Sequence, residues 1–232
     1  MKTQIKSLLL LCFAAGSFLL SSCDDFLDRQ EDEKMTFEKI WQSRNTVKQY
    51  WLNAMSFLPQ PRNTYCGDYD PYLGASDECT IAYDRQYRYI NFGSWNASNV
   101  PYYKMASYYK GIRECNIFMQ NVYSCSDPLA SKADLDMYYY QAKFARAFYY
   151  FCMMRDYGPV FLLGDELLDF TATTEDLYRP RNTWEECVDY VVSEMTACAE
   201  SDAVKTQFEA AEYGLATKGT CYAVISLSLI HI

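Results

Sequence analysis

The stretch Leu135–Pro159, LDMYYYQAKFARAFYYFCMMRDYGP, predicts a long helix around which the other elements must pack. At 3.6 residues per turn its apolar and aromatic side chains cover most of the circumference, so the helix needs neighbours on more than one side. These side chains are Leu135, Tyr139, Ala142, Ala145, Tyr149 and Cys152, with Phe144, Phe148 and Phe151 beside them. We expect the helix to end where Gly158 can take a left-handed conformation and Pro159 cannot extend it.

Two regions on the N-terminal side of this stretch have helical patterns. Between residues 36 and 58 we expect a short helix and then a longer one, capped by Ser43 or Asn45. The next helix is expected over 101–123, where Asn116 interrupts an otherwise apolar face. Because buried amides are normally hydrogen-bonded, we expect Asn116 to find a partner in the core.

Two further helices are predicted on the C-terminal side. Residues 160–181 have the character of a loop, with a short strand as the alternative. Thr183 and Glu186 form a capping box at the start of a helix over 183–200, and a last helix is expected to open near Tyr213.

Successive helices would pair as antiparallel hairpins, 102–123 with 132–156 and 183–200 with 213 onward. Small residues at Ala142, Ala145 and Ala147 would allow neighbouring helices to approach closely. The predicted fold is therefore all-α, with tetratricopeptide-like hairpins and one long aromatic loop insertion. A strict 34-residue repeat is not visible, so an irregular helical domain without repeats stays as the alternative.

That loop runs over residues 59–99, where helical periodicity is lost. Prolines and glycines punctuate a stretch rich in Tyr and Asp, and a loop of this length in a compact domain is either functional or disordered. Its many aromatic side chains favour order. We expect this loop to carry the binding surface.

Composition excludes several classes of function. The net charge of −9 argues against nucleic acid as a partner, because nucleic-acid binding needs a basic surface. No stretch is long and apolar enough to cross a bilayer. The sequence contains one histidine and no CxxC pair, so we expect neither a metal site nor a cofactor.

The ten cysteines do not indicate a disulfide framework. Five of them fall within helical patterns, where cysteine serves as a small apolar core residue. These are Cys115, Cys152, Cys187, Cys198 and Cys221. Cys66 and Cys79 lie in the long loop and could pair in an exported protein.

The N-terminus has the pattern of a targeting segment. Lys2 and Lys6 precede the apolar run 8–20, which indicates a signal peptide over residues 1–22. The sequence Leu-Ser-Ser-Cys ending at Cys23 resembles a bacterial lipobox, in which the cysteine is lipidated; an ordinary signal peptide is the alternative. The acidic residues 23–35 would then form a tether behind the lipid anchor.

The C-terminal residues contain no helix-capping residue and do not end in a polar segment. Because the chain ends in the apolar string ISLSLIHI, we expect residues 226–232 to be a non-native tail on a truncated chain. His231 lies in that tail, and we assign it no function.

Several motifs together resemble the SusD/RagB family of outer-membrane nutrient-binding lipoproteins, over nearly the whole chain. The motifs are SCDDFLD at 22–28, NFGSW at 91–95, YYKGIRECN at 108–116, AKFARAFYY at 142–150, DYGPV at 156–160 and ATKG at 216–219. Members of that family are considerably longer. The resemblance therefore implies that residues 36–225 are an incomplete SusD-like N-terminal helical domain.

The resemblance also implies a function. It implies a non-enzymatic lipoprotein of the Bacteroidetes outer membrane, exposed at the surface and anchored through palmitate or a related acyl chain on Cys23. Such a protein captures a glycan or oligosaccharide and delivers it to a SusC-like TonB-dependent transporter. Sugars stack on Trp and Tyr, while Asp and Asn bind their hydroxyls. The candidate ligand residues are Trp95, Asn96, Asn99, Tyr72 and Asp70. For Trp95 the alternative is that it anchors the loop on the helices.

Two other functions compete with this one. A helical-repeat scaffold at the surface or in the periplasm would bind protein partners or peptides. A glycoside hydrolase would need two carboxyls roughly 5–10 Å apart. Candidate pairs in the loop are Asp77 with Glu78 and Asp68 with Asp70, but neighbouring loop acids give no sign of that geometry.

Overall fold

The computed structural model describes residues 35–59, 75–77, 88–100, 103–169, 171, 173, 175 and 178–230. Several predicted features lie outside these residues: the signal peptide, Cys23, almost all of the tether, Cys66, Cys79, Asp70, Tyr72 and His231. The chain divides into two compact units, Met1–Phe37 and Glu38–Ile232. The helices that pack together belong to the second unit.

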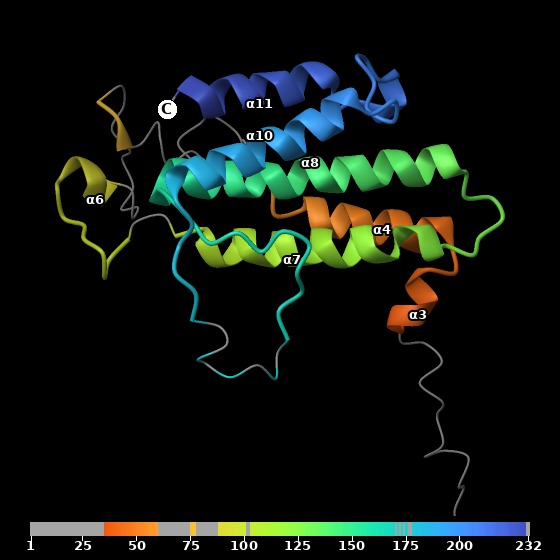
Figure 1. The fold of residues 1–232 in the computed structure, drawn as a ribbon, viewed down its shortest axis with the longest axis horizontal. Helices are drawn as coiled ribbons and strands as arrows, with labels where there is room; N and C mark the ends of the chain where they lie inside the picture. Colours follow the sequence, from red (N-terminus) through yellow and green to blue (C-terminus); the bar gives the residue numbers. More distant parts are fainter. Residues whose placement is uncertain are drawn as a thin grey trace, which may run out of the picture. The chain divides into compact units, whose positions relative to one another are not determined.

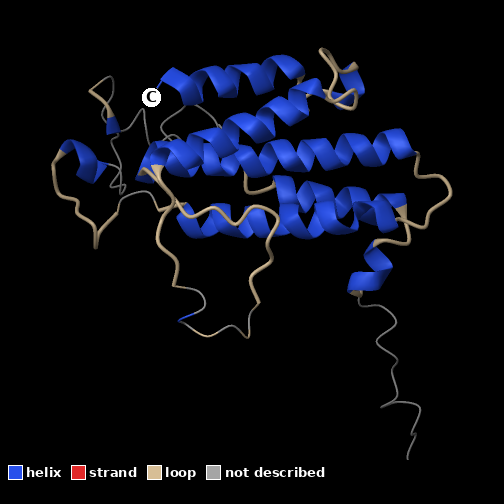
Figure 2. Cartoon of the chain, viewed as in Figure 1, coloured by secondary structure: helices blue, strands red, loops and turns tan. Residues whose placement is uncertain are grey.

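The described part of the second unit is helical. Its elements and those at its border are α3 (Phe37–Ile40), α4 (Arg44–Met55), α6 (Arg88–Asn91), α7 (Met105–Asn121), the 3₁₀ turn η2 (Val122–Ser124), α8 (Lys132–Tyr157), α10 (Trp184–Glu200), the 3₁₀ turn η3 (Ala210–Glu212) and α11 (Lys218–Ile230). Helix α8 lies in the middle, with α4 and α7 on one side and α10 and α11 on the other (Figure 1). Helices joined by loops make up the described chain in Figure 2, which confirms the all-α fold of paired helices.

Helix α8 begins and ends as its sequence predicts. The Ser131 hydroxyl accepts a hydrogen bond from the Asp134 amide at 3.1 Å and caps the N-terminus. Gly158 ends the helix with a φ of +74°, a conformation that favours glycine. Of the nine apolar and aromatic side chains predicted to face its neighbours, six are buried, while Tyr139, Phe148 and Phe151 are half-buried. The predicted small contacts Ala142, Ala145 and Ala147 are completely buried.

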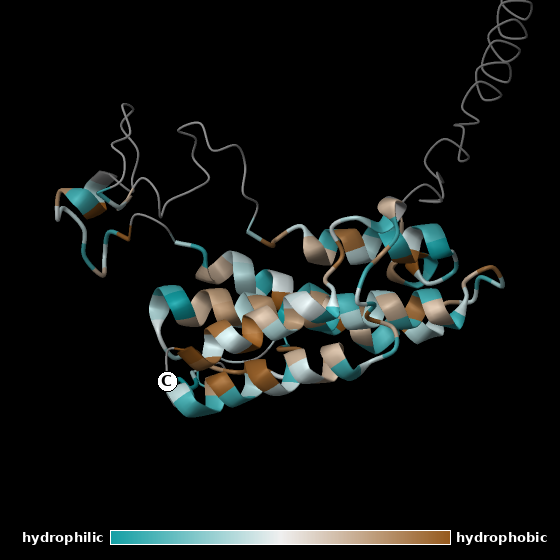
Figure 3. Ribbon diagram, turned by 90° about the horizontal axis from the view of Figure 1, so that it is seen from above, coloured by the Kyte–Doolittle hydropathy of each residue, from teal (hydrophilic) through white to brown (hydrophobic). Residues whose placement is uncertain are grey.

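The neighbours of α8 are held by close contacts. A Cβ atom placed on Gly111 of α7 would lie 2.8 Å from the Tyr149 ring, so the two helices approach at a point where only glycine fits. The Tyr149 hydroxyl donates to the Ala54 carbonyl at 2.6 Å, so the residue of α8 that contacts Gly111 also holds α4. Figure 3 shows hydrophobic and hydrophilic positions alternating along the helices, as expected when each has a buried and an exposed face.

The helix caps and core cysteines agree with their predictions. Ser43 caps α4, and Thr183 and Glu186 form the capping box of α10. The five helical cysteines are fully buried free thiols. Burial raises the pKa of Cys115 and Cys152 to about 12, so these thiols stay protonated and unreactive at neutral pH.

Helix α11 begins at Lys218 instead of near Tyr213, so that prediction was wrong by about one turn. Gly214 has a φ of +101°, which interrupts the helix. The Gln141 side chain of α8 forms hydrogen bonds with both backbone groups of Ala216: it accepts from the N–H at 2.9 Å and donates to the carbonyl at 2.8 Å. Thr217 is therefore the first residue that can cap the helix, and its hydroxyl accepts from the Thr220 amide at 3.2 Å.

Other segments differ in detail. Helix α7 is described from Met105 to Asn121, shorter than predicted, and η2 continues it. The described residues of 160–181 contain no strand, and all of them except the helical Glu175 form loop and turns. Residues 226–230 are the last turns of α11, while their assignment to a non-native tail stays a prediction.

None of the described helices is both long enough and apolar enough to span a bilayer. Within the same residues, no group of three His, Cys, Asp or Glu side chains is placed to hold a metal ion.

Candidate functional site

The first candidate site is the loop over residues 91–100. It turns at Gly93, whose φ is +63°, and Asn96 and Asn99 exchange backbone hydrogen bonds of 3.3 and 2.9 Å. The Asn96 Oδ1 atom also accepts from the amides of Ser98 and Asn99, at 2.9 and 3.1 Å. The side-chain carbonyl of Asn96 is thus committed to holding its own turn.

Trp95 stands beside this turn with 52% of its surface exposed, and Phe92 is 62% exposed. The structure thus brings Trp95, Asn96 and Asn99 together in one turn, while Tyr72 and Asp70 lie outside the described residues. Exposed aromatic rings next to amide groups are the chemistry that a sugar-binding surface needs. Of the four acids in the candidate hydrolase pairs, Asp77 alone lies within the described residues, and it is exposed.

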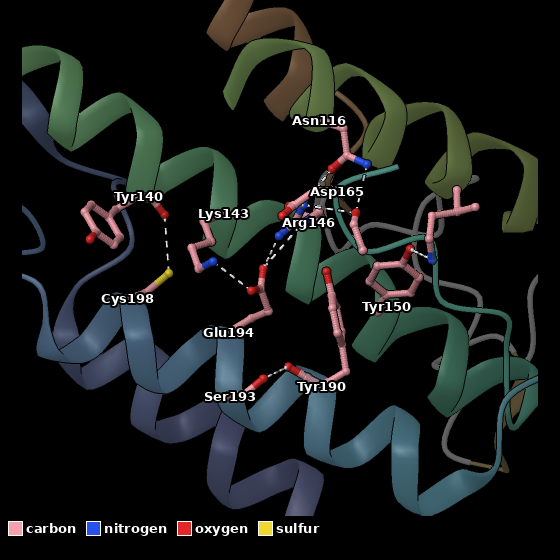
Figure 4. A network of polar contacts seen from close by, with 12 residues as sticks. Asn116, Tyr140, Lys143, Arg146, Tyr150, Asp165, Tyr190, Ser193, Glu194 and Cys198 are labelled. Atoms are coloured by element: carbon pink, nitrogen blue, oxygen red, sulfur yellow. Dashed lines mark hydrogen bonds and ion pairs between the residues drawn. The ribbon is translucent and has the colours of Figure 1, made fainter. Parts of the chain in front are cut away.

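A second, buried feature was not predicted. Arg146 of α8 is only 2% exposed, and its guanidinium donates through Nε and Nη2 to the Glu194 carboxylate of α10 (Figure 4). Lys143 adds an ion pair to Glu194 at 2.7 Å. On its other side Arg146 donates to Asn116 Oδ1 at 2.7 Å, to the Gly164 carbonyl at 3.0 Å and to the Asp165 carboxylate. The partner predicted for Asn116 is therefore confirmed.

We call the segment 161–169 the wall. Arg146 and Asn116 belong to a larger set of helix side chains that hold the wall in place through hydrogen bonds to its backbone. Irregular backbone must satisfy its polar groups, and here helix side chains take the place of a neighbouring strand. The bonds are Tyr109 Oη to Phe161 O (2.9 Å), Leu163 N to Tyr150 Oη (3.0 Å), Asn116 Nδ2 to Gly164 O (2.9 Å) and Glu166 O (3.0 Å), Gln120 Nε2 to Asp165 O (2.8 Å), and Arg113 Nη1 to Leu168 O (2.8 Å).

The wall and α7 enclose a hollow of about 390 Å³, which we call the α7 cleft. Its lining residues are Tyr109, Arg113, Phe161, Leu163, Glu166, Leu168 and Asp169. The rings of Tyr109 and Phe161 stack with centroids 4.5 Å apart and planes within 11°. The cleft therefore has aromatic and aliphatic walls with charged groups at its edge.

The charged groups at this edge are held by partners. Glu166 accepts two hydrogen bonds from Arg179, both 2.6 Å long, which lower the pKa of its carboxyl. The Thr171 amide donates to Asp169 and lowers the pKa of Asp169 in the same way. Both carboxylates are therefore ionised at neutral pH and fixed in orientation.

A second hollow, of about 260 Å³, lies between the start of α8 and the segment after α10. Its acids are Asp134, Asp136, Asp202 and Glu212. Asp136 is paired with Lys132 and with the Tyr123 hydroxyl, and Glu212 with Lys205. These are exposed ion pairs of the kind that contribute little to stability or binding.

Stacked helix hairpins with exposed aromatic residues and irregular connecting segments define a class of helical binding domain. Comparison with known proteins identifies the family. The family model described as "Starch-binding associating with outer membrane" matches residues 25–228, so the chain belongs to the SusD-like family. This confirms the resemblance seen in the sequence, and the descriptions of the family and of two structural neighbours are those of binding proteins, as predicted.

Solved structures share the fold. A SusD-like protein from Bacteroides fragilis is 24% identical with a TM-score of 0.68, over 84% of this chain and 36% of that one. The surface glycan-binding protein A of Bacteroides uniformis is 17% identical, with a TM-score of 0.62, over 82% and 42%. The protein of that name from Bacteroides thetaiotaomicron, in complex with laminarihexaose, is 16% identical with a TM-score of 0.59, over 81% and 39%.

This chain thus spans well under half the length of these similar structures. No curated protein gives a significant match to it.

Proposed function

We propose that the protein is a surface-exposed lipoprotein of the outer membrane that binds a glycan or oligosaccharide and delivers it to a SusC-like TonB-dependent transporter. The observation that carries this proposal is the SusD-like family match over residues 25–228, whose description joins starch binding with the outer membrane. The laminarihexaose complex of one structural neighbour supports an oligosaccharide as ligand.

The ligand surface in this proposal includes Trp95, Asn96 and Asn99, with Tyr72 and Asp70 from the same long loop. Trp95 supplies an exposed flat ring beside a turn that Asn96 holds in shape. A sugar can stack its apolar face on the indole, because aromatic rings combine a large apolar area with little conformational entropy to lose.

Calorimetric titration of the protein with maltohexaose and laminarihexaose tests binding. We expect Trp95→Ala to weaken binding of the preferred oligosaccharide and to leave the helical circular dichroism unchanged. Tyr213→Ala is the matched control, because Tyr213 is an aromatic residue that is 96% exposed at another place. Loss of helical signal in Trp95→Ala would make Trp95 structural, and cleavage of the oligosaccharide would contradict a pure binding function.

We infer that Cys23 carries the lipid anchor, after a signal peptide over residues 1–22 and ahead of an acidic tether over 23–35. Metabolic lipid labelling of the wild type and of Cys23→Ala tests the anchor: labelling that persists in the variant would contradict it. Protease digestion of intact cells tests surface exposure. Co-purification with a barrel protein of the outer membrane tests delivery; capture of such a partner without any glycan binding would favour a protein-binding scaffold instead.

A further inference from the structure

We propose that the α7 cleft is a second sugar subsite, separate from the loop at 91–100, and that it takes a single neutral pyranose ring. The inference rests on the proposed function for the class of ligand. The site itself rests on the size, lining and rigidity of the cleft.

The cleft has the size and the floor that a sugar ring requires. Its volume of about 390 Å³ lies within the roughly 300–1,000 Å³ of small-molecule sites. Tyr109 is stacked on Phe161 and meets the Tyr150 ring edge-on, with centroids 6.4 Å apart. Phe161 is therefore the ring that can offer a face to a ligand, with Leu163 and Leu168 completing the apolar floor.

The edge of the cleft favours hydroxyl donors. A carboxylate offers about four lone-pair positions, and the two bonds from Arg179 occupy only part of the capacity of Glu166. Asp169 adds a second acceptor. Arg113 and Arg179 balance the two carboxylates in charge, so the edge gives no net attraction to an anion or a cation. A ring with an apolar face and hydroxyls around its rim matches this combination.

The cleft is also formed before any ligand binds. Its wall is fixed by helix side chains at Phe161, Leu163, Gly164, Asp165, Glu166 and Leu168. A ligand that enters a fixed site does not have to order a loop, which lowers the free-energy cost of binding.

Methyl NMR of leucine-labelled protein tests the proposal. Glucose, maltohexaose and laminarihexaose serve as probes, and N-acetyl-leucine amide is the apolar competitor. We expect at least one of the sugars to shift the methyl signals of Leu163 and Leu168 but not those of Leu129, which is 67% exposed in a distant turn. Phe161→Leu keeps apolar bulk but removes the flat ring, and it should weaken this response roughly three- to tenfold.

The outcomes separate the subsite from the proposed function. If the oligosaccharides bind and Trp95→Ala abolishes binding, while the Leu163 and Leu168 signals never move, the subsite is wrong and the function stands. A response in Phe161→Leu equal to that of the wild type, or a stronger response to N-acetyl-leucine amide than to any sugar, also overturns the subsite. The Trp95 indole N–H is followed in ¹⁵N-labelled protein with the same sugars; if no sugar shifts it or any leucine methyl signal, both proposals fail.

Discussion

The wall at 161–169 and the loop at 91–100 are both irregular segments of similar length, but they are held in opposite ways. The wall is fixed by side chains of α7 and α8 that reach its backbone, with the buried Arg146 among them. In the loop, the turn at 96–99 is held by its own Asn96, whose bonds span two and three residues, and Asn91 at the start of the loop donates to the Ser76 carbonyl. The wall should therefore lose its shape only together with the helix core, whereas the loop can open alone.

The difference follows from burial. A buried guanidinium is costly to desolvate and is tolerated only when each of its donors has a partner. Arg146 has such partners in Glu194, Asn116, Asp165 and the Gly164 carbonyl. Its position on α8 thus ties α10, α7 and the wall to one another (Figure 4).

The largest effect is expected for Arg146→Met, which removes the shared partner of these groups. Buried Asn116 would lose its charged partner, and the half-buried Glu194 would keep only its ion pair with Lys143. Breaking a buried pair typically costs about 3–5 kcal/mol. Urea unfolding followed by circular dichroism measures the loss. Arg155→Met is the matched control on the same helix, because the Arg155 side chain is 39% exposed and its ion pair is with the neighbouring Asp156; its effect should stay within about 1 kcal/mol.

Equal losses in the two variants would mean that the Arg146 network does not hold the fold. Adding Glu194→Gln to Arg146→Met sharpens the test. In Arg146→Met the Glu194 carboxylate has lost its two bonds from Arg146 and keeps only Lys143, so removing its charge costs less there than in the wild type. The double variant should therefore be more stable than the sum of the single losses.

The next effect concerns Asn116, which joins the network to the wall. Asn116→Ala removes the bonds to Gly164 and Glu166 and leaves their carbonyls without this donor, so we expect a loss of about 1–3 kcal/mol. Hydrogen exchange should show faster opening of the wall amides and no change in residues 91–100. Asn121→Ala is the control, because among the bonds described the Asn121 side chain donates only to the Ile117 carbonyl of its own helix. Uniformly faster exchange across both segments would contradict the separation between them.

The sequence predicts the parts of this fold that depend on local pattern. The ends of α8, the capping box of α10 and the buried cysteines follow from periodicity and from residues within one turn of each other. The partner of Asn116 was also expected, although its identity was not. Each of these features can be decided within a window of about 25 residues.

The rest depends on which helices meet. Arg146 and Glu194 are 48 positions apart, and Gln141 and Ala216, which set the start of α11, are 75 apart. The α7 cleft likewise joins Tyr109 to Phe161 across 52 positions. An arginine within an apolar stripe was the one local sign of the network, because a charged residue there needs a partner in the fold.

A smaller effect is expected from acid. The Arg146 guanidinium, by its hydrogen bond, lowers the pKa of Asp165 below the usual 3.8. A folded pKa below the unfolded one means that this contribution is complete above pH 3.8 and is lost as the pH falls through the lower folded value. Asp165 is largely exposed, so the effect on global stability should be small.

NMR chemical shifts of the wall amides, recorded from pH 5 to pH 2, measure this titration. Glu166 and Asp169 have lowered pKa values as well, so the comparison is made with Asp165→Asn, which should flatten the response of Gly164 and Asp165. The loop at 91–100 contains no Asp or Glu and should show no titration of its own. A response of that loop parallel to the wall would mean that the two segments are coupled.

The smallest effect on stability is expected for Asn96→Ala. Among the bonds described, the Asn96 side-chain oxygen Oδ1 accepts only from the amides of Ser98 and Asn99, and these bonds are exposed, so global stability should change by less than about 0.5 kcal/mol. Asn99→Ala is the matched control, because the bonds described at Asn99 use its backbone, which alanine retains. We expect Asn96→Ala to increase the motion of residues 95–99 in ¹⁵N relaxation, and Asn99→Ala to leave it unchanged. If Asn96→Ala leaves the loop as rigid as before, contacts outside the turn must hold Trp95, and the contrast between a self-held loop and a helix-held wall would no longer stand.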